Sequence, residues 1–151
     1  MNETKLPEGM DFLLANICHL HHSRASKYFA TLNLYRGQPP VLRALWVEDG
    51  LTQKELAEKM QISPATMTKM LQRMEKAGFI RRQSDLDDLR YSRVFLSEKG
   101  RAIQSQVEKV FKKMEAETFV NLSEYDLDQL RRYLHQIREN LLQVTGESPW
   151  S

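Results

Sequence analysis

The sequence has very little of what marks a secreted or membrane-bound protein. It contains one cysteine, Cys18, so an internal disulfide is excluded and a reducing compartment is the natural setting. No apolar run is long enough to span a bilayer, and the first twelve residues lack the basic start and apolar centre of a signal peptide. We therefore expect a cytoplasmic protein with no membrane partner.

Glycine and proline are also scarce, with 6 and 5 residues among 151. The sequence has neither a phosphate-binding glycine loop nor a nucleophile placed beside a base, so we expect no enzymatic activity and no cofactor. Apolar residues make up 41% of the chain and charged residues 28%, which is typical of one soluble globular domain.

A large excess of one charge is absent too, because the net charge is only +2. The charges are nevertheless unevenly distributed. Residues 52–93 hold 9 Lys/Arg against 6 Asp/Glu, whereas residues 115–151 hold 3 against 7. Any polyanionic partner should therefore meet the middle of the chain.

Apolar spacing and turn formers predict a mainly helical chain with one β-hairpin. In order, we expect helices over about 11–34 and 41–49, two short helices over 52–61 and 63–77, strands at "FIRRQ" and "YSRVFL", one long helix from Ser97 and a last helix from about Ser123. The glycine and two prolines in "RGQPP" are expected to interrupt the helix between the first two helical segments.

The two short central helices have clear start and stop signals. Thr52 followed by Glu55 is a capping box, and Ser63 followed by Pro64 suits the start of a second helix. Gly78 suits a left-handed residue after the last turn. Two short helices joined by a tight turn predict a helix-turn-helix.

The second helix has the composition of a DNA-reading helix. An α-helix fits the major groove, and its first turns usually carry the base contacts. Hydroxyls can reach phosphates or bases, a small residue allows close approach, and cations attract the duplex. The candidates are Ser63, Ala65, Thr66, Thr68, Lys69 and Arg73. For an isolated helix, an ordinary solvated face would be the better interpretation.

The hairpin that follows favours the DNA-reading interpretation over an ordinary solvated face, because arginines lie on or beside it. They are Arg81, Arg82, Arg90 and Arg93. Arg90, near the turn, could enter a minor groove, and Asp88 could orient its guanidinium. The alternative is a local surface ion pair worth about 0–1 kcal/mol. Nearby Asp85 and Asp87 would repel phosphate unless paired, which favours a held geometry over a simple basic patch.

The segment "LTQKELAEKMQISPATMTKMLQRMEKAGFIRRQSDLDDLRYSRVFLSEKG" resembles the winged helix-turn-helix of the MarR family of transcription regulators. The matching features are L-T-Q-x-x-L-A, S-x-x-T-x-T, L-x-x-M-E-K-x-G-F-I-x-R, D-x-x-D-x-R and L-S-x-x-G, in that order and spacing. They cover about the middle third of the chain. Ser97 stands where the family more often has Thr, and Leu89 stands where it usually has a charge.

This resemblance implies a DNA-binding domain over 37–100, flanked by dimerisation helices in 1–36 and 101–151. It implies a homodimer that binds palindromic double-stranded DNA as a ligand-released repressor. The implied major-groove set adds Pro64 to the candidates above, and the implied wing set is Arg82, Asp88, Arg90 and Arg93.

The terminal helices carry apolar stripes that need a partner surface. The last helix alternates spacings of three and four, the seam of helices packing at a shallow angle. The dimerisation candidates are Leu13, Ile17, Leu20, Leu127, Leu130, Leu134, Ile137 and Leu141.

Many relatives of this kind release DNA on binding a small phenolic or lipophilic effector between the dimer arm and the winged domain. Candidates for such a pocket are Arg24, Tyr28, Arg43 and Trp46. The favoured alternative is that Tyr28 and Trp46 are core aromatics whose polar tips are satisfied.

The stretch "CHLHH" raises a thiol switch or metal clamp at Cys18 as a further alternative. No resolving cysteine exists, and a bound metal normally needs three or four ligands. We expect no metal site, with Cys18 buried and inert and the histidines on the surface. A final alternative is a protein-interaction module that keeps the fold without binding DNA.

Overall fold

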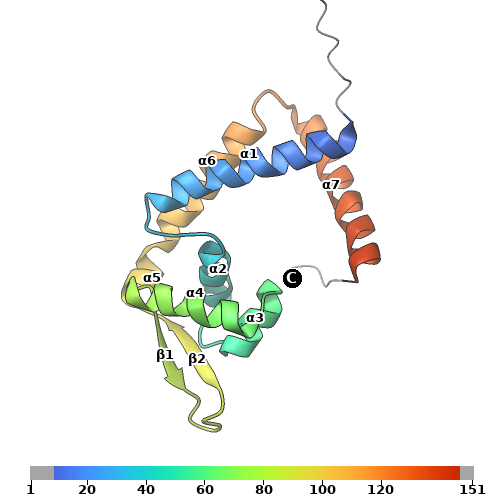
Figure 1. Ribbon diagram of the computed structural model, residues 1–151. Coiled ribbons are helices and arrows are strands. Elements are labelled where there is room, and N and C mark those ends of the chain that lie inside the picture. The colour runs from blue at the N-terminus through green and yellow to red at the C-terminus, as the bar shows by residue number, and fades with distance from the viewer. Residues whose placement is uncertain (1–8, 147–151) are drawn as a thin grey trace, which may run out of the picture.

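The computed structural model describes residues 9–146, and its element order is shown in Figure 1. The elements are α1 (Met10–Ala30), α2 (Gln38–Val47), α3 (Gln53–Met60), α4 (Pro64–Lys76), β1 (Ile80–Ser84), β2 (Ser92–Leu96), α5 (Glu98–Ala102), α6 (Gln104–Thr118) and α7 (Glu124–Thr145). This is the predicted order, with one helix more than expected.

The boundaries differ from the sequence predictions at three places. α1 ends at Ala30 rather than near residue 34, and the chain turns so that Leu34 is buried in the core. The helix is interrupted between α1 and α2, as expected, but Pro39 and Pro40 lie in the first turn of α2 rather than before it, where a missing N–H has no helical partner to lose. The long helix from Ser97 divides into α5 and α6 at Ile103, which keeps right-handed helical angles of φ −71° and ψ −14°.

The hydrophobic core is formed mainly by α2, α3, α4 and the hairpin. α4 contributes Met67, Leu71 and Met74, which are fully buried. They join buried residues of the neighbouring elements: Leu34, Val41, Leu42, Leu45, Leu56, Phe79, Val94 and Val107. One contiguous cluster therefore fixes α2, α3, α4, the hairpin and the start of α6 relative to one another.

Gly100 allows α5 to pack closely onto the start of the hairpin. A Cβ at this position would lie 2.1 Å from the Phe79 carbonyl oxygen, so only glycine fits without a shift of the backbone. The Gly100 carbonyl also accepts a hydrogen bond from Trp46 Nε1 at 2.9 Å. Trp46 is thus a packed aromatic with its polar tip satisfied, as the favoured alternative predicted.

An arm formed by α1 and α6 extends from this core, and α7 turns away from its far end (Figure 1). Phe29 of α1 and Phe111 of α6 pack edge to face with ring centroids 5.3 Å apart. In contrast, α7 has no buried residue along its length. None of the helices within residues 9–146 is long and apolar enough to cross a membrane.

Candidate nucleic-acid interface

The turn between α3 and α4 is fixed by the signals read in the sequence. Thr52 Oγ1 accepts the Glu55 N–H at 3.1 Å, and Glu55 Oε2 accepts the Thr52 N–H at 2.7 Å, which completes the predicted capping box. Gln61 then adopts a left-handed conformation with φ 53°, and the Ile62 N–H reaches the Ala57 carbonyl at 3.1 Å. These contacts set the direction in which α4 leaves.

α4 presents its polar face to solvent. Ser63 caps the helix by accepting the Thr66 N–H at 3.1 Å, and its own hydroxyl donates to Thr66 Oγ1 at 2.9 Å. Lys69 and Arg73 lie one turn apart and are exposed. The other exposed members of the predicted set are Pro64 and Ala65. The structure therefore brings the predicted residues together on one side of one helix.

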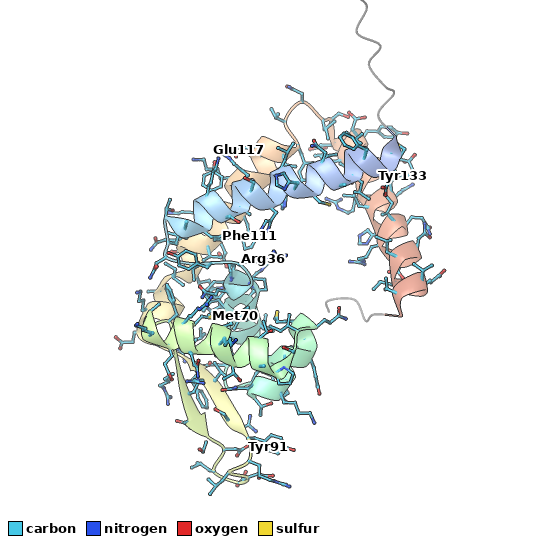
Figure 2. All side chains as sticks on the ribbon, viewed as in Figure 1. Arg36, Met70, Tyr91, Phe111, Glu117 and Tyr133 are labelled. Carbon is cyan, nitrogen blue, oxygen red and sulfur yellow. The ribbon has the colours of Figure 1, made fainter. Side chains whose placement is uncertain are left out.

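Thr68 differs from the rest of that set because it is half-buried. Its hydroxyl donates to the Pro64 carbonyl at 2.9 Å and accepts from Gln53 Nε2 of α3 at 3.3 Å. Met70, labelled in Figure 2, is partly buried on the neighbouring side of α4, where its methyl group fills the space beside Gly37. These contacts hold α4 from its flanks and leave the face around Lys69 and Arg73 open.

The predicted hairpin is present, with antiparallel pairing from Ile80 opposite Leu96 to Ser84 opposite Ser92. The Tyr91 N–H donates to the Asp88 carbonyl at 3.1 Å, which closes a four-residue turn with Leu89 and Arg90 at its centre. The Asp85 N–H donates to the Tyr91 carbonyl at 2.8 Å and continues the pairing past the strands. Figure 2 places Tyr91 beside this turn, at the end of the hairpin far from the core.

Arg90 and Asp88 form the ion pair that the spacing suggested. Arg90 Nη2 lies 2.8 Å from Asp88 Oδ2, and Arg90 Nε contacts the same carboxylate. The hydrogen bonds from the Arg90 side chain lower the pKa of Asp88, so the pair stays ionised near neutral pH. The Arg90 side chain is 84% exposed, so a held cation projects from the turn.

Arg82 is directed toward α4 rather than toward solvent. Its Nη2 lies 3.0 Å from Glu75 Oε1, and its backbone N–H donates to Glu75 Oε2 at 2.8 Å. Sequence reasoning missed Glu75, although an acid in the last turn of a helix opposes the helix dipole and so suggests a nearby partner. The side-chain hydrogen bond from Arg82 lowers the pKa of Glu75.

Arg93 is likewise engaged within the chain. Its Nε lies 3.0 Å from Asp85 Oδ2, and its Nη1 donates to the Gly50 carbonyl at 2.8 Å. Asp85 also accepts the Asp87 N–H at 2.9 Å, which is the first cause of its lowered pKa, followed by the charge of Arg93. Arg82 and Arg93 therefore brace the wing, whereas Arg90 projects from it.

The residues considered for an effector pocket do not line one site. Arg24 Nη2 donates to the Tyr28 hydroxyl at 2.8 Å, and both residues bind Glu117 of α6, with Arg24 Nε at 3.1 Å from its carboxylate. These hydrogen bonds lower the pKa of Glu117 to about 2. Sequence reasoning missed Glu117, because its partners lie 93 and 89 residues away along the chain.

Arg43 instead borders a pocket of about 310 Å³ under the arm. Its guanidinium carbon lies 4.5 Å from the centre of the Phe111 ring. The lining residues are His21, Arg43, Phe111, Met114, Glu115, Thr118 and Phe119. Of the four predicted pocket residues, only Arg43 contributes to this space.

The expectation of a buried Cys18 is wrong, because the cysteine is exposed. The reason is that every residue from Met10 to His22 is exposed, so none of this half of α1 lies in the core. Among the described residues, no group of three or more histidine, cysteine or acidic side chains is placed to hold a metal ion.

A helix-turn-helix followed by a two-stranded wing defines the winged-helix class of domain, and this one has an arginine at its tip. The model of the MarR family matches residues 34–91 of the chain. The matched family and the named relatives are transcriptional regulators rather than enzymes.

Named relatives agree with this family match. The HTH-type transcriptional regulator TtmR of Methylorubrum extorquens (strain PA1) is 37% identical over 68 residues, which span 45% of this chain and 35% of that relative. A MarR transcriptional regulator from Methanosarcina mazei Go1 superposes with a TM-score of 0.77 at 25% identity, covering 87% of this chain and 95% of its own. The fold also matches the S. aureus MepR–DNA complex, with a TM-score of 0.78 at 24% identity over 88% of this chain and 98% of that one.

Proposed function

We propose that this chain is a cytoplasmic, sequence-specific regulator of transcription that binds double-stranded DNA as a homodimer. The observation that carries the proposal is the exposed polar face of α4 beside a wing whose tip holds one projecting arginine. Residues 37–100 would form the DNA-binding domain, and 1–36 and 101–151 would form the dimer.

In this proposal α4 enters the major groove. Lys69 and Arg73 are exposed on the face that is free of core contacts, and an arginine can grip guanine through two hydrogen bonds. The start of α4, with Ser63, Pro64, Ala65 and Thr66, would lie against phosphates, where the helix N-terminus favours an anion. Thr68 would serve mainly to hold α4 against α3, because its hydroxyl is engaged there.

The wing would reach the neighbouring minor groove through Arg90. Asp88 fixes the guanidinium before binding, so less side-chain entropy is lost when the duplex is met. We assign Arg82 and Arg93 to the support of the wing rather than to contact with DNA, since each is bound to an acid of the same chain.

The dimer is supported by apolar side chains that lack cover within the chain. Leu13, Ile17 and Leu20 of α1 are 39%, 48% and 59% exposed, and Leu134, Ile137 and Leu141 of α7 are 45%, 36% and 54% exposed. Apolar surface of this extent usually marks an interface. A two-fold dimer would present two α4 helices to half-sites about one turn of DNA apart, roughly 10 bp centre to centre.

We further propose that the protein represses and is released by an effector. The support is the pocket of about 310 Å³ at the junction of α1, α2 and α6, where Arg43 offers a cation and Phe111 an aromatic face. Such a pair suits a small aromatic anion. Benzoate is a direct probe: it should raise the thermal midpoint of the protein and lower its affinity for duplex, and Arg43→Ala should abolish both effects.

The test of DNA binding is a fluorescence-anisotropy titration against pools of genomic duplexes at two salt concentrations. A regulator should bind a subset of duplexes tightly, and its affinity should fall steeply with salt as counterions are released from several phosphates. A protein-interaction module with the same fold would bind no duplex at either salt concentration, which would overturn the proposal.

A further inference from the structure

We propose that Leu86 and Leu89, two apolar residues at the wing tip, pack against the deoxyribose walls of the minor groove beside Arg90. This inference rests on the proposed function, and it adds an apolar contact that the arginine alone does not provide. Leu89 stands at a position where the sequence resemblance leads one to expect a charge.

Both leucines are displayed to solvent at the tip. Leu86 is 90% exposed and Leu89 is 80% exposed, compared with 84% for the Arg90 side chain between the same two strands. Leu89 and Arg90 occupy the two central positions of the turn closed by Asp88 and Tyr91. A surface that receives Arg90 must therefore also meet Leu89.

The tip is braced so that the leucines do not fold back onto the hairpin. At one end of the loop, the Asp85 carboxylate binds Arg93 and accepts a hydrogen bond from the Asp87 N–H. The Asp88 carboxylate accepts hydrogen bonds from the Arg90 backbone N–H and from its guanidinium. The carboxylates of Asp85 and Asp88 are therefore engaged within the tip, where they fix its backbone. The two apolar side chains are left facing outward, where exposure brings them no stabilisation.

The minor groove is an occupant that fits this chemistry. Its walls are the C–H faces of deoxyribose, and its width of about 6 Å brings them close to any side chain inserted beside an arginine. DNA-binding proteins commonly place leucine and other apolar side chains in this groove. The pairing of Asp85 and Asp88 with arginines also reduces the repulsion between the tip and the phosphates.

An apolar contact has a different signature from an ionic contact, and the test depends on this difference. Contacts to phosphate release counterions and so set the slope of log K against log salt, whereas contacts to sugar do not. The double variant L86A/L89A should therefore weaken binding to a selected duplex by about fivefold at every salt concentration, with an unchanged slope. Arg90→Ala should instead make the slope less steep by about 0.9, the value for the loss of one cation that neutralises a phosphate.

A second variant tests where the tip lies. Leu89→Lys places a cation at the same position and should steepen the slope by about 0.9 if the tip is within reach of the backbone. Val47→Ala serves as the matched control, because Val47 is an equally exposed apolar residue, 90% exposed, at the end of α2. It should leave both affinity and slope unchanged.

The outcomes separate this inference from the proposed function. If the unmodified protein binds no duplex, the proposed function fails. If it binds and L86A/L89A binds equally well, or if L86A/L89A alters the slope, the inference fails while DNA binding stands. Unchanged duplex affinity combined with altered self-association would assign the leucines to a protein contact instead, and would also overturn it.

Discussion

The carboxylate of Glu75 holds Arg82 by two routes, through the guanidinium at 3.0 Å and through the backbone N–H at 2.8 Å. Glu75 lies in the last turn of α4 and Arg82 in β1, so one side chain joins the candidate recognition helix to the wing. A protein that reads two adjacent grooves needs the two elements at a fixed separation. We therefore interpret the charges of Glu75 and Arg82 as a structural contact between α4 and the wing rather than as a direct DNA contact.

Glu75→Ala should weaken duplex binding by roughly threefold, the scale of a partly exposed ion pair. The sign is informative, because removing a negative charge near phosphates would strengthen binding if Glu75 did nothing else. The thermal midpoint should also fall, since Arg82 is left half-buried without its carboxylate. Anisotropy titrations and thermal melts of the same samples measure both effects.

Glu58→Ala is the matched control, because it removes an exposed acid from α3 of the same helix-turn-helix. It should leave affinity unchanged or slightly raised. Equal or tighter binding by Glu75→Ala would show that the Glu75–Arg82 contact does not position the wing.

The local signals in the sequence were sufficient to place most of the winged domain. Capping at Thr52 and Ser63, the proline at the start of α4 and the glycine after its end each act within a few residues, and all are present in the structure. The second helix was expected to begin at residue 41, after the two prolines, but it begins at Gln38, because proline both interrupts a helix and favours the first turn of one. Whether the two prolines interrupt a helix or begin one is decided by how the residues beside them are buried in the core.

Partners distant in the chain were beyond the reach of such signals. Glu117 binds residues about ninety positions away. Glu75 and Asp85 lie only 7 and 8 positions from Arg82 and Arg93, but these pairings depend on how the hairpin folds against α4 and across its own loop. Cys18 was expected to be buried because free cysteine usually is, but no residue from Met10 to His22 is buried within residues 9–146. In the proposed homodimer a second copy would cover the terminal helices, and a local sequence pattern does not show such a partner.

Arg73→Ala and Arg90→Ala should change specificity in different ways. Arg73 lies on the exposed face of α4, so its loss should relax the base preference within the half-site by about 1–3 kcal/mol at one position. Arg90 projects from the wing, so its loss should weaken binding most where the flanks are rich in A·T and the minor groove is narrow. Titrations against duplexes varied separately in half-site and flank distinguish the two, and equal losses on every sequence would contradict both roles.

Glu117→Gln should lower the thermal midpoint at neutral pH and have less effect in acid. Its pKa is lowered to about 2 from 4.5 by Arg24 and Tyr28, so the carboxylate favours the folded state above about pH 4.5. That contribution is lost as the pH falls toward 2, since the folded state then also takes up the proton. The effect should be small, because the Arg24 and Glu117 side chains are 53% and 37% exposed.

Melts of the Glu117 variant and the unmodified protein at pH 7 and pH 3 measure this dependence. The difference between their midpoints should narrow at pH 3. Tyr28→Phe removes one donor to the same carboxylate and should give a smaller loss at pH 7. A difference that stays constant with pH would show that Glu117 acts through packing rather than through its charge.

Leu134→Glu and Leu141→Glu should convert a dimer into a monomer. Both leucines are about half exposed on α7, which has no buried residue in the single chain, so a charge there would be well tolerated by a monomer. Within a dimer interface the same charge would be buried without a partner, at a cost that a helix seam does not withstand. Sedimentation equilibrium should give the mass of two chains for the unmodified protein and of one chain for each variant. Val47→Glu, at an exposed apolar site at the end of α2, should leave the dimer intact.

The monomeric variants should also lose tight binding to a full palindrome while keeping weak binding to a single half-site, because each winged domain folds around its own core. A full dimer mass for both α7 variants would remove α7 from the interface.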